Sequence, residues 1–295
     1  MMFCRLCVSV GLFLCVLQWL RTSRPTLLLG ALTGLAIAAT YLTKLSNLPL
    51  VVVVLVAIIA KLPVAIRQKP KAALIAYAVL VFCAAIPIGS WIVWTKYQFG
   101  DLTGSAPKIT LLGWTHKPFS DWWQHPIFTL RGFWAFWWDL ITSFWCGEVK
   151  WRGQPLSCPV TDGLYAASTP VLLAAALLGL RKKAGLSTFQ RQAIGVAALC
   201  FIASVGFLAL LSIQFDFGNC INPSRAHPYF ASGRLLTGAL IPFALSYVYG
   251  IDWLLRRINP VLPLLVLGVI LLFMTTSEIV VNRVAFQSEH NLFHL

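Results

Sequence analysis

Charged residues are scarce in this chain, and acidic residues are the scarcest. Only 11% of its 295 residues are charged, and Asp and Glu together number nine, against 23 Lys and Arg. A soluble domain carries about a quarter charged residues, so this composition could not cover a globular surface with polar groups. No acid precedes Asp101. The composition therefore excludes a soluble globular protein and favours a chain whose surface faces lipid.

Several catalytic signatures are absent as well. The sequence has no Walker phosphate-binding loop, no HExxH and no GxSxG, so soluble-type nucleotide hydrolysis, zinc proteolysis and serine hydrolysis have no support. Cys4 and Cys7 form a lone CxxC without a second pair or a nearby histidine, which argues against a metal site. We therefore predict no metal site and identify no cofactor, and whether a divalent metal assists a substrate stays open.

Long apolar runs take the place of polar surface. Hydrophobic residues make up 59% of the chain, and the mean hydropathy is +0.80. Backbone groups inside hydrocarbon must be paired internally, so spanning segments are helices or closed barrels. Barrel strands would be about ten residues long with alternating polarity, whereas these runs are longer and continuously apolar. We predict an all-α, polytopic transmembrane bundle, one membrane domain over 1–295, with about eight spans at 3–20, 26–43, 46–62, 73–95, 163–180, 193–214, 235–255 and 261–281.

Basic residues occupy alternate breaks between these spans. Lys and Arg cluster after the first, third, fifth and seventh spans, and none of those four breaks contains an acid. The positive-inside rule places these breaks in the cytoplasm. The other breaks then lie outside: the turn 44–47, the segment 96–162, the loop 215–234 and the tail 282–295. Membrane orientation and anionic lipid thus explain the net charge of +14, and no nucleic-acid partner is expected.

The exterior segment 96–162 is rich in tryptophan, a residue that prefers the membrane–water boundary. In 131–145 the aromatic and aliphatic residues recur at three- and four-residue steps, whereas Asp139, Thr142 and Ser143 share another face. This pattern predicts an aromatic helix that lies in the outer interface. Two interpretations stay open: an anchor that seals the bundle, or one wall of a cleft that admits a lipid-linked substrate.

Four basic residues beside the exterior breaks are candidate phosphate ligands: Lys44, Arg225, His227 and Arg234. A lysine or arginine near a span can bind a phosphate, but it can also anchor the chain at the headgroup level. Both roles stay open here, and Asp216 could instead be the salt-bridge partner of Arg234.

Two further groups of side chains in the exterior segments receive no catalytic role. Cys146 and Cys158 could form a disulfide if their loop faces an oxidising compartment. The exterior acids are interpreted as solvated loop residues, and the catalytic base is unknown; they are Asp101, Asp121, Asp139, Glu148 and Asp162.

Three stretches, in order along residues 30–245, resemble the GT-C class of polytopic membrane glycosyltransferases. Residues 34–44 read GLAIAATYLTK, which is similar to the G-L-x-x-x-x-x-L-T-K span of the mannosyltransferase and aminoarabinose-transferase-like branch. Residues 94–101, WTKYQFGD, resemble the W-N-Y-x-x-F-G-D-P stretch that ends a span in many bacterial members. Residues 232–236, SGRLL, followed by Pro242, resemble the late x-x-R-Y-x-x-P span.

The resemblance implies transfer of a sugar from a polyprenyl-phosphate carrier to an acceptor on the outer face of a bacterial inner membrane. It implies that Lys44 and Arg234 bind the lipid phosphate, where negative charge develops as the carrier leaves. Arg225 and His227 lie in the same late segment as Arg234 and join it as substrate-binding candidates.

The chain departs from the family pattern at the catalytic acid, which the family carries ahead of L-T-K. The positive-inside orientation also puts the N-terminus outside. Both features lead us to expect the C-terminal portion of a longer protein, without the N-terminal catalytic loop and inactive as this chain alone. The alternative is a non-catalytic transporter or flippase for a lipid-linked sugar, or a scaffold. Transporters usually show internal repeats; none is convincing here, and intramembrane charge is sparse, which favours the transferase.

Overall fold

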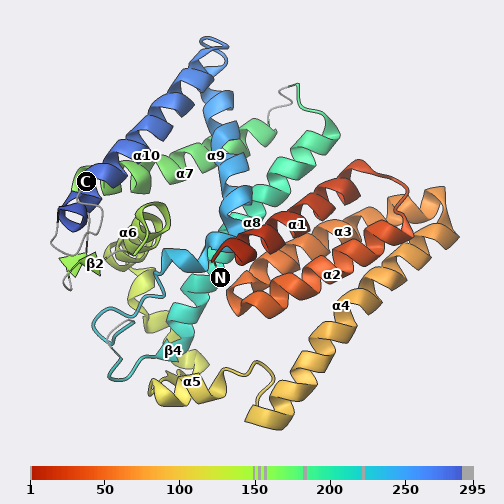
Figure 1. Ribbon diagram of the computed structural model, residues 1–295, viewed down its shortest axis with the longest axis horizontal. Helices are drawn as coiled ribbons and strands as arrows, with labels where there is room; N and C mark the ends of the chain where they lie inside the picture. Colours follow the sequence, from red (N-terminus) through yellow and green to blue (C-terminus); the bar gives the residue numbers. More distant parts are fainter. Residues whose placement is uncertain are drawn as a thin grey trace.

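The computed structural model describes residues 2–148, 150–151, 154–155, 158–181, 185–220 and 223–287. Within these residues the chain is almost wholly helical (Figure 1). The α-helices are α1 (Met2–Arg21), α2 (Leu27–Thr43), α3 (Leu48–Gln68), α4 (Pro70–Phe99), α5 (Ala106–Leu111), α6 (Leu130–Cys146), α7 (Pro159–Arg181), α8 (Thr188–Gln214), α9 (Leu240–Leu255) and α10 (Leu262–Phe286).

Short strands and 3₁₀ turns join the helices at one end. Strand β1 (Thr115–His116) pairs antiparallel with β4 (Phe215–Asp216), and β2 (Lys150–Trp151) pairs with β3 (Gln154–Pro155). The β1–β4 pair thereby ties the segment after α5 to the segment after α8. The 3₁₀ turns are η1 (Leu45–Asn47), η2 (Phe119–Gln124), η3 (Pro126–Phe128), η4 (Gly233–Leu235) and η5 (Thr237–Ala239).

Each of the eight predicted spans coincides with a helix. Six helices among the described residues are long and apolar enough to cross a membrane: Leu45–Gln68, Pro70–Phe99, Pro159–Arg181, Thr188–Gln214, Thr237–Leu255 and Leu262–Arg283. The apolar parts of α1 and α2 are shorter, over Cys7–Arg21 and Leu27–Thr43. The chain is therefore a helical, multi-pass membrane protein, and the number of eight crossings stays a prediction.

Several helix boundaries differ from the predicted spans: α3 ends at Gln68 rather than at residue 62, α8 begins at Thr188 rather than at residue 193, and a third difference affects a predicted ligand. The regular helix α9 begins at Leu240 rather than at residue 235, because the turns η4 and η5 come before it. Pro242 fits near the new start, since the first N–H groups of a helix have no intrahelical partner. Arg234 consequently lies in a turn outside the regular helix.

Close helix contacts depend on glycine. Gly30 and Gly34 of α2 have GxxxG spacing, and they face α4. A Cβ on Gly30 would lie 2.3 Å from the Ala76 carbonyl oxygen, and one on Gly34 would lie 2.4 Å from that of Leu80. Small residues at this spacing let helices approach closely in a membrane, where packing rather than the hydrophobic effect holds helices together.

Helix α8 joins two hydrophobic clusters. Its first half packs with α1–α4 through residues such as Ala197 and Cys200. Its second half packs with α6, α7 and α9 through residues such as Phe201 and Leu208. Outside these clusters, α10 exposes large apolar side chains; Leu264 is 70% exposed and Leu272 is 68% exposed. In a membrane protein such a surface faces lipid tails.

The two ends of the bundle differ (Figure 1). The α1–α2 and α3–α4 connections lie at the right and the α9–α10 connection lies at the top, with the end of α7 and the start of α8 between them, and we name this end the basic end. Helix α6 lies at the left, α5 and strand β4 lie toward the bottom, and α9 begins near the centre; these elements form the loop-rich end. The predicted alternation of breaks is thus reproduced in space. Helix α6 is seen nearly end-on and runs across the long helices.

Candidate functional site

Two of the predicted ligands meet at the loop-rich end. Lys44 follows α2 in extended conformation, and its Nζ donates a hydrogen bond to the Arg234 carbonyl oxygen at 3.0 Å. These residues are 190 positions apart in the sequence. The end of α2 and the turn before α9 therefore form one local structure.

A close approach of two turns supports this contact. Turn η5 packs on turn η1, where a Cβ on Gly238 would lie 2.2 Å from Asn47 Oδ1. Asn47 is buried, and its Nδ2 donates to the Thr40 carbonyl at 3.3 Å. Only glycine at 238 leaves room for the asparagine that closes α2, so these glycine and amide positions fix the geometry around Lys44.

Helix α6 holds the other side of the Arg234 turn. Ser143 Oγ donates to the Ala231 carbonyl and accepts from the Gly233 N–H, each at 2.8 Å. A Cβ on Gly233 would lie 2.1 Å from the Phe144 nitrogen. The segment 231–233 therefore lies directly against the α6 backbone.

The Arg234 guanidinium points to an acid that the sequence did not suggest. Its Nε lies 3.4 Å from Glu148 Oε2 and donates to Ser232 Oγ at 3.1 Å, while Ser232 also donates to Glu148. The alternative pairing of Arg234 with Asp216 is wrong. The Arg234 side chain is 75% exposed, and exposed ion pairs contribute about 0–1 kcal/mol. An anionic ligand could replace Glu148 at little cost.

The remaining two predicted ligands are also paired with carboxylates. Arg225 binds Asp216 in a bidentate manner, Nε–Oδ1 at 3.1 Å and Nη2–Oδ2 at 3.3 Å. This guanidinium lowers the pKa of Asp216. His227 Nε2 lies 2.6 Å from Asp139 Oδ2 on α6. Sequence reasoning missed these pairs, because nothing local in the sequence links partners that come from different segments.

The polar face predicted for the aromatic helix has a structural role. Helix α6 begins after Thr129, whose hydroxyl caps it by accepting from the Gly132 N–H at 3.0 Å. Asp139 and Ser143 lie one turn apart on α6, and Glu148 follows its end. All three bind segment 227–234, so this face holds the loop that carries Arg234.

An apolar groove of about 430 Å³ runs between α7, α9 and α10. Tyr165 and Tyr247 line it, and their hydroxyls bond to Ser277 (3.3 Å) and Ser168 (3.1 Å). Trp145 at the end of α6 stacks on the Tyr165 ring at 4.6 Å. One end of the groove therefore lies next to the helix turn that leads to Glu148.

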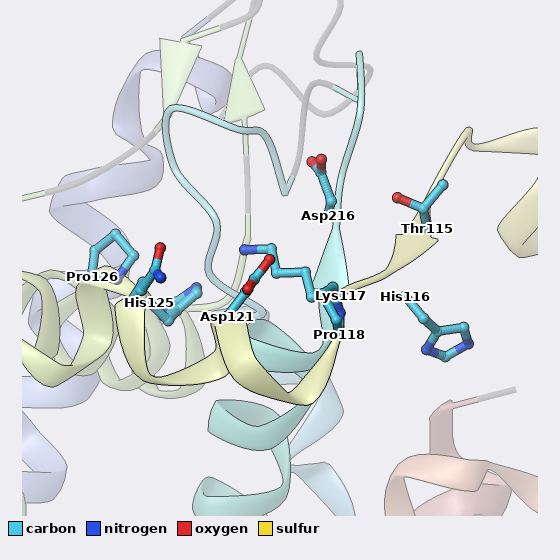
Figure 2. Close-up of a pocket in the computed structure, with 9 residues that line it drawn as sticks. Thr115, His116, Lys117, Pro118, Asp121, His125, Pro126 and Asp216 are labelled. Carbon is cyan, nitrogen blue, oxygen red and sulfur yellow. The ribbon is translucent and has the colours of Figure 1, made fainter.

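A second, polar cleft of about 370 Å³ opens beside the β1–β4 pair (Figure 2). Its lining residues come from β1, η2, η3 and β4 and from the residues that connect β1, η2 and η3: Thr115, His116, Lys117, Pro118, Asp121, Gln124, His125, Pro126 and Asp216. His125 is only 3% exposed; its Nδ1 accepts from the Ile127 N–H, so its Nε2–H donates to the Pro228 carbonyl. Burial, followed by the nearby Lys117 charge, lowers the pKa of His125 to about 4.

Cys146 and Cys158 are free thiols, so the disulfide considered for an oxidising compartment is not formed in this structure. The Cys146 sulfur instead lies 3.6 Å from Asp162 Oδ1. Burial and this carboxylate raise the pKa of Cys146 to about 12. The Thr161 backbone and hydroxyl lie beside the Cys158 thiol and lower its pKa, and the hydroxyl donates a hydrogen bond to the Cys158 carbonyl oxygen at 2.8 Å.

The exterior acids are all engaged by other groups. Besides the ion pairs above, Asp101 accepts from backbone N–H groups of its own turn, which lower its pKa to about 2. Asp121 accepts from the Ser120 hydroxyl at 2.9 Å. Among the described residues no group of three His, Cys, Asp or Glu side chains could hold a metal ion. The geometry therefore provides cations and a lipid-facing groove, but it singles out no catalytic base.

The chain matches no protein-family model, no curated protein and no solved structure.

Proposed function

We propose that the loop-rich end binds the phosphate of a polyprenyl-phosphate-linked sugar on the outer face of a bacterial inner membrane. The protein would act as a GT-C-like membrane glycosyltransferase, with eight crossings and with α6 in the outer interface. The observation that carries the proposal is the contact between Lys44 Nζ and the Arg234 carbonyl oxygen at 3.0 Å. It brings two cationic residues of distant segments to one end of a membrane bundle.

The chemistry suits a lipid phosphate. Guanidinium and ammonium groups form charge-assisted hydrogen bonds with phosphate oxygens, and they stabilise the negative charge that develops on a departing carrier. Arg234 can exchange Glu148 for such a ligand, because the pair is exposed. Arg225 and His227 are held by Asp216 and Asp139, and we assign them a supporting role in shaping the loop.

The apolar groove supports a lipid carrier rather than a soluble phosphate. Its walls are membrane helices, and a polyprenyl chain is the occupant that such walls would accept. Trp145 contacts the groove residue Tyr165, and Glu148 follows three residues later beside Arg234. A chain in the groove could therefore keep its phosphate near the Arg234 turn.

A lipid-linked sugar transporter is the second candidate. It is favoured by the exterior acids, which are held in ion pairs or hydrogen bonds, so that the geometry singles out none of them as a base. Both functions need the same phosphate site. Sugar transfer to an acceptor distinguishes the first function, and movement of the intact lipid-linked sugar across vesicles distinguishes the second.

Binding of polyprenyl phosphate by the purified chain tests the proposal. Native mass spectrometry would compare the wild type with Lys44→Ala and Arg234→Ala, and Lys108→Ala on the exposed face of α5 would serve as the control. A hydrogen bond to a charged group contributes about 1.5–3 kcal/mol, so each site variant should bind about tenfold to a hundredfold more weakly. Uncharged polyprenol should bind all variants equally. Wild-type affinity in both site variants would contradict the proposal.

A further inference from the structure

The polar cleft beside the β1–β4 pair has no role in the function proposed above. It lies in the loops of the loop-rich end rather than among the membrane helices. Its volume of about 370 Å³ falls in the range of small-molecule sites. Its lining is polar, in contrast to the groove between α7, α9 and α10, which suggests a ligand that is itself polar.

Lys117 is the central charge of this cleft. Its side chain is half-buried, and within the described ranges no acceptor bonds to its Nζ. Its backbone is fixed on both sides: the N–H donates to the Gln214 carbonyl at 2.9 Å, and the carbonyl accepts from Trp122 Nε1 at 3.2 Å. The ammonium is close enough to lower the pKa values of both Asp216 and His125. A half-buried ammonium on a fixed backbone, with no acceptor among the described residues, is suited to a ligand oxygen.

The carboxylates of the cleft argue against an anionic ligand. Asp121 lines the cleft with an exposed side chain, and the Asp216 charge is already balanced by Arg225. A phosphate placed on Lys117 would meet the charge of Asp121. A hydroxyl group meets no such penalty, because it can donate to Asp121 and accept from Lys117 at the same time.

Neighbouring groups extend this match to a ligand with several hydroxyls. Thr115 and Gln124 each offer both a donor and an acceptor to the cleft. The same turn η2 carries the rings of Phe119 and Trp123, which are 66% and 67% exposed and pack edge to face at 6.3 Å but do not line the cleft. Mixed donors and acceptors within the cleft suit a molecule that presents several hydroxyl groups.

We infer that this cleft binds an uncharged, hydroxyl-rich carbohydrate, with Asp121 accepting from its hydroxyls and Lys117 donating to them. The inference does not depend on the lipid-phosphate site, and the sugar could come from either the acceptor or the lipid-linked donor. Its chemistry is the same in both cases.

Saturation-transfer NMR on the full chain in nanodiscs of lipids without sugar headgroups tests this directly. The probes are methyl glycosides of mannose, glucose, galactose and arabinose, with inorganic phosphate as the anionic probe. The variants are Asp121→Asn and Lys117→Met, and Lys108→Met is the matched control on the same end. We expect at least one glycoside to bind, and its Kd to rise about tenfold in each cleft variant but to stay unchanged in the control.

Three results would overturn the inference: no glycoside binds, binding persists unchanged in both cleft variants, or phosphate binds through Lys117 while the glycosides do not. Monodisperse elution of each variant would show that loss of binding is not loss of fold. Competition by polyprenyl-phosphate mannose would indicate the donor sugar, and simultaneous binding would indicate an acceptor. Lys44→Ala and Arg234→Ala should leave glycoside binding unchanged, so failure here and failure of the lipid-phosphate site are separate results.

Discussion

The basic end and the loop-rich end of the bundle use charge in different ways. The four breaks at the basic end carry Lys and Arg without an acid, and Arg256 there pairs with Asp252 of α9 at 3.5 Å. At the loop-rich end, carboxylates on or next to α6 pair with cations from a distant loop. Charge at the basic end needs only to face the correct side of the membrane, whereas charge at the loop-rich end also sets tertiary structure.

The two ends would no longer differ in this way if the loop-rich end were not a fixed structure. Gly233→Val tests this, and it has the largest expected effect of the changes described below. A side chain at 233 would meet the α6 backbone 2.1 Å from the Phe144 nitrogen, so one of the two backbones would have to shift. Overpacking of this kind should lower the free energy of unfolding by about 3 kcal/mol. Thermal unfolding in detergent would measure it against Gly268→Val on α10, where nothing lies within 4 Å. Equal midpoints would contradict a close contact between α6 and the loop.

The second largest effect is a pH dependence of the free energy of unfolding, which arises from His125 at the loop-rich end. Since the folded-state pKa of His125 is lowered from 6.5 to about 4, the unfolded chain binds the proton more tightly. Stability should be unaffected above pH 6.5 and should fall as the pH drops from 6.5 toward 4, by up to about 3 kcal/mol. His125→Gln should flatten this part of the melting profile. The neighbouring Lys117 keeps its charge over this pH range and therefore does not contribute to the change. If His125→Gln and the wild type lose stability equally between pH 6.5 and 4, the burial of a neutral imidazole is refuted.

Thiol reactivity tests the different environments of Cys146 and Cys158 at the junction between α6 and α7. With each cysteine kept as the only one in the chain, Cys158 should react with a maleimide at pH 7 about tenfold or more faster than Cys146. The reason is that the Thr161 backbone and hydroxyl favour the Cys158 thiolate, whereas burial disfavours that of Cys146. Mass spectrometry of timed samples gives the rates, and equal rates would argue against the described environments.

The smallest effect concerns the exchange of partners at Arg234. Glu148→Gln removes the competing charge, so polyprenyl phosphate should bind up to about fivefold more tightly, in line with an exposed pair of about 0–1 kcal/mol. Titration followed by native mass spectrometry would detect this. Asp252→Asn, which removes an exposed carboxylate at the basic end, is the control. Weaker binding in Glu148→Gln would mean that the acid supports the site rather than competes for it.

Much of the fold is predictable from sequence because hydropathy and charge are local signals. The eight spans coincide with helices, and the aromatic pattern over 131–145 is a helix, α6. The late start of α9 could not be predicted from the sequence, because the turns before it depend on Gly233 packing against α6 and on Gly238 packing against Asn47. These contacts come from segments far apart in the chain.

The candidate site is predictable only in its cations. Lys44, Arg225, His227 and Arg234 stand out as charges beside apolar spans. Their partners do not, since the acids Asp139 and Glu148 look like ordinary loop or helix-surface residues in sequence. The polar cleft was missed because the β1–β4 pair that forms its base has only two residues in each strand.

The most direct test of the central claim is the side of the membrane on which Lys44 and Arg234 lie. Lys44→Cys, Arg234→Cys and Arg256→Cys, each in a background without other cysteines, would be treated with a membrane-impermeant maleimide in intact cells. The account predicts labelling at 44 and 234 but not at 256, which should become accessible only after the membrane is opened. Labelling of 44 and 234 from opposite sides would contradict a shared lipid-phosphate site.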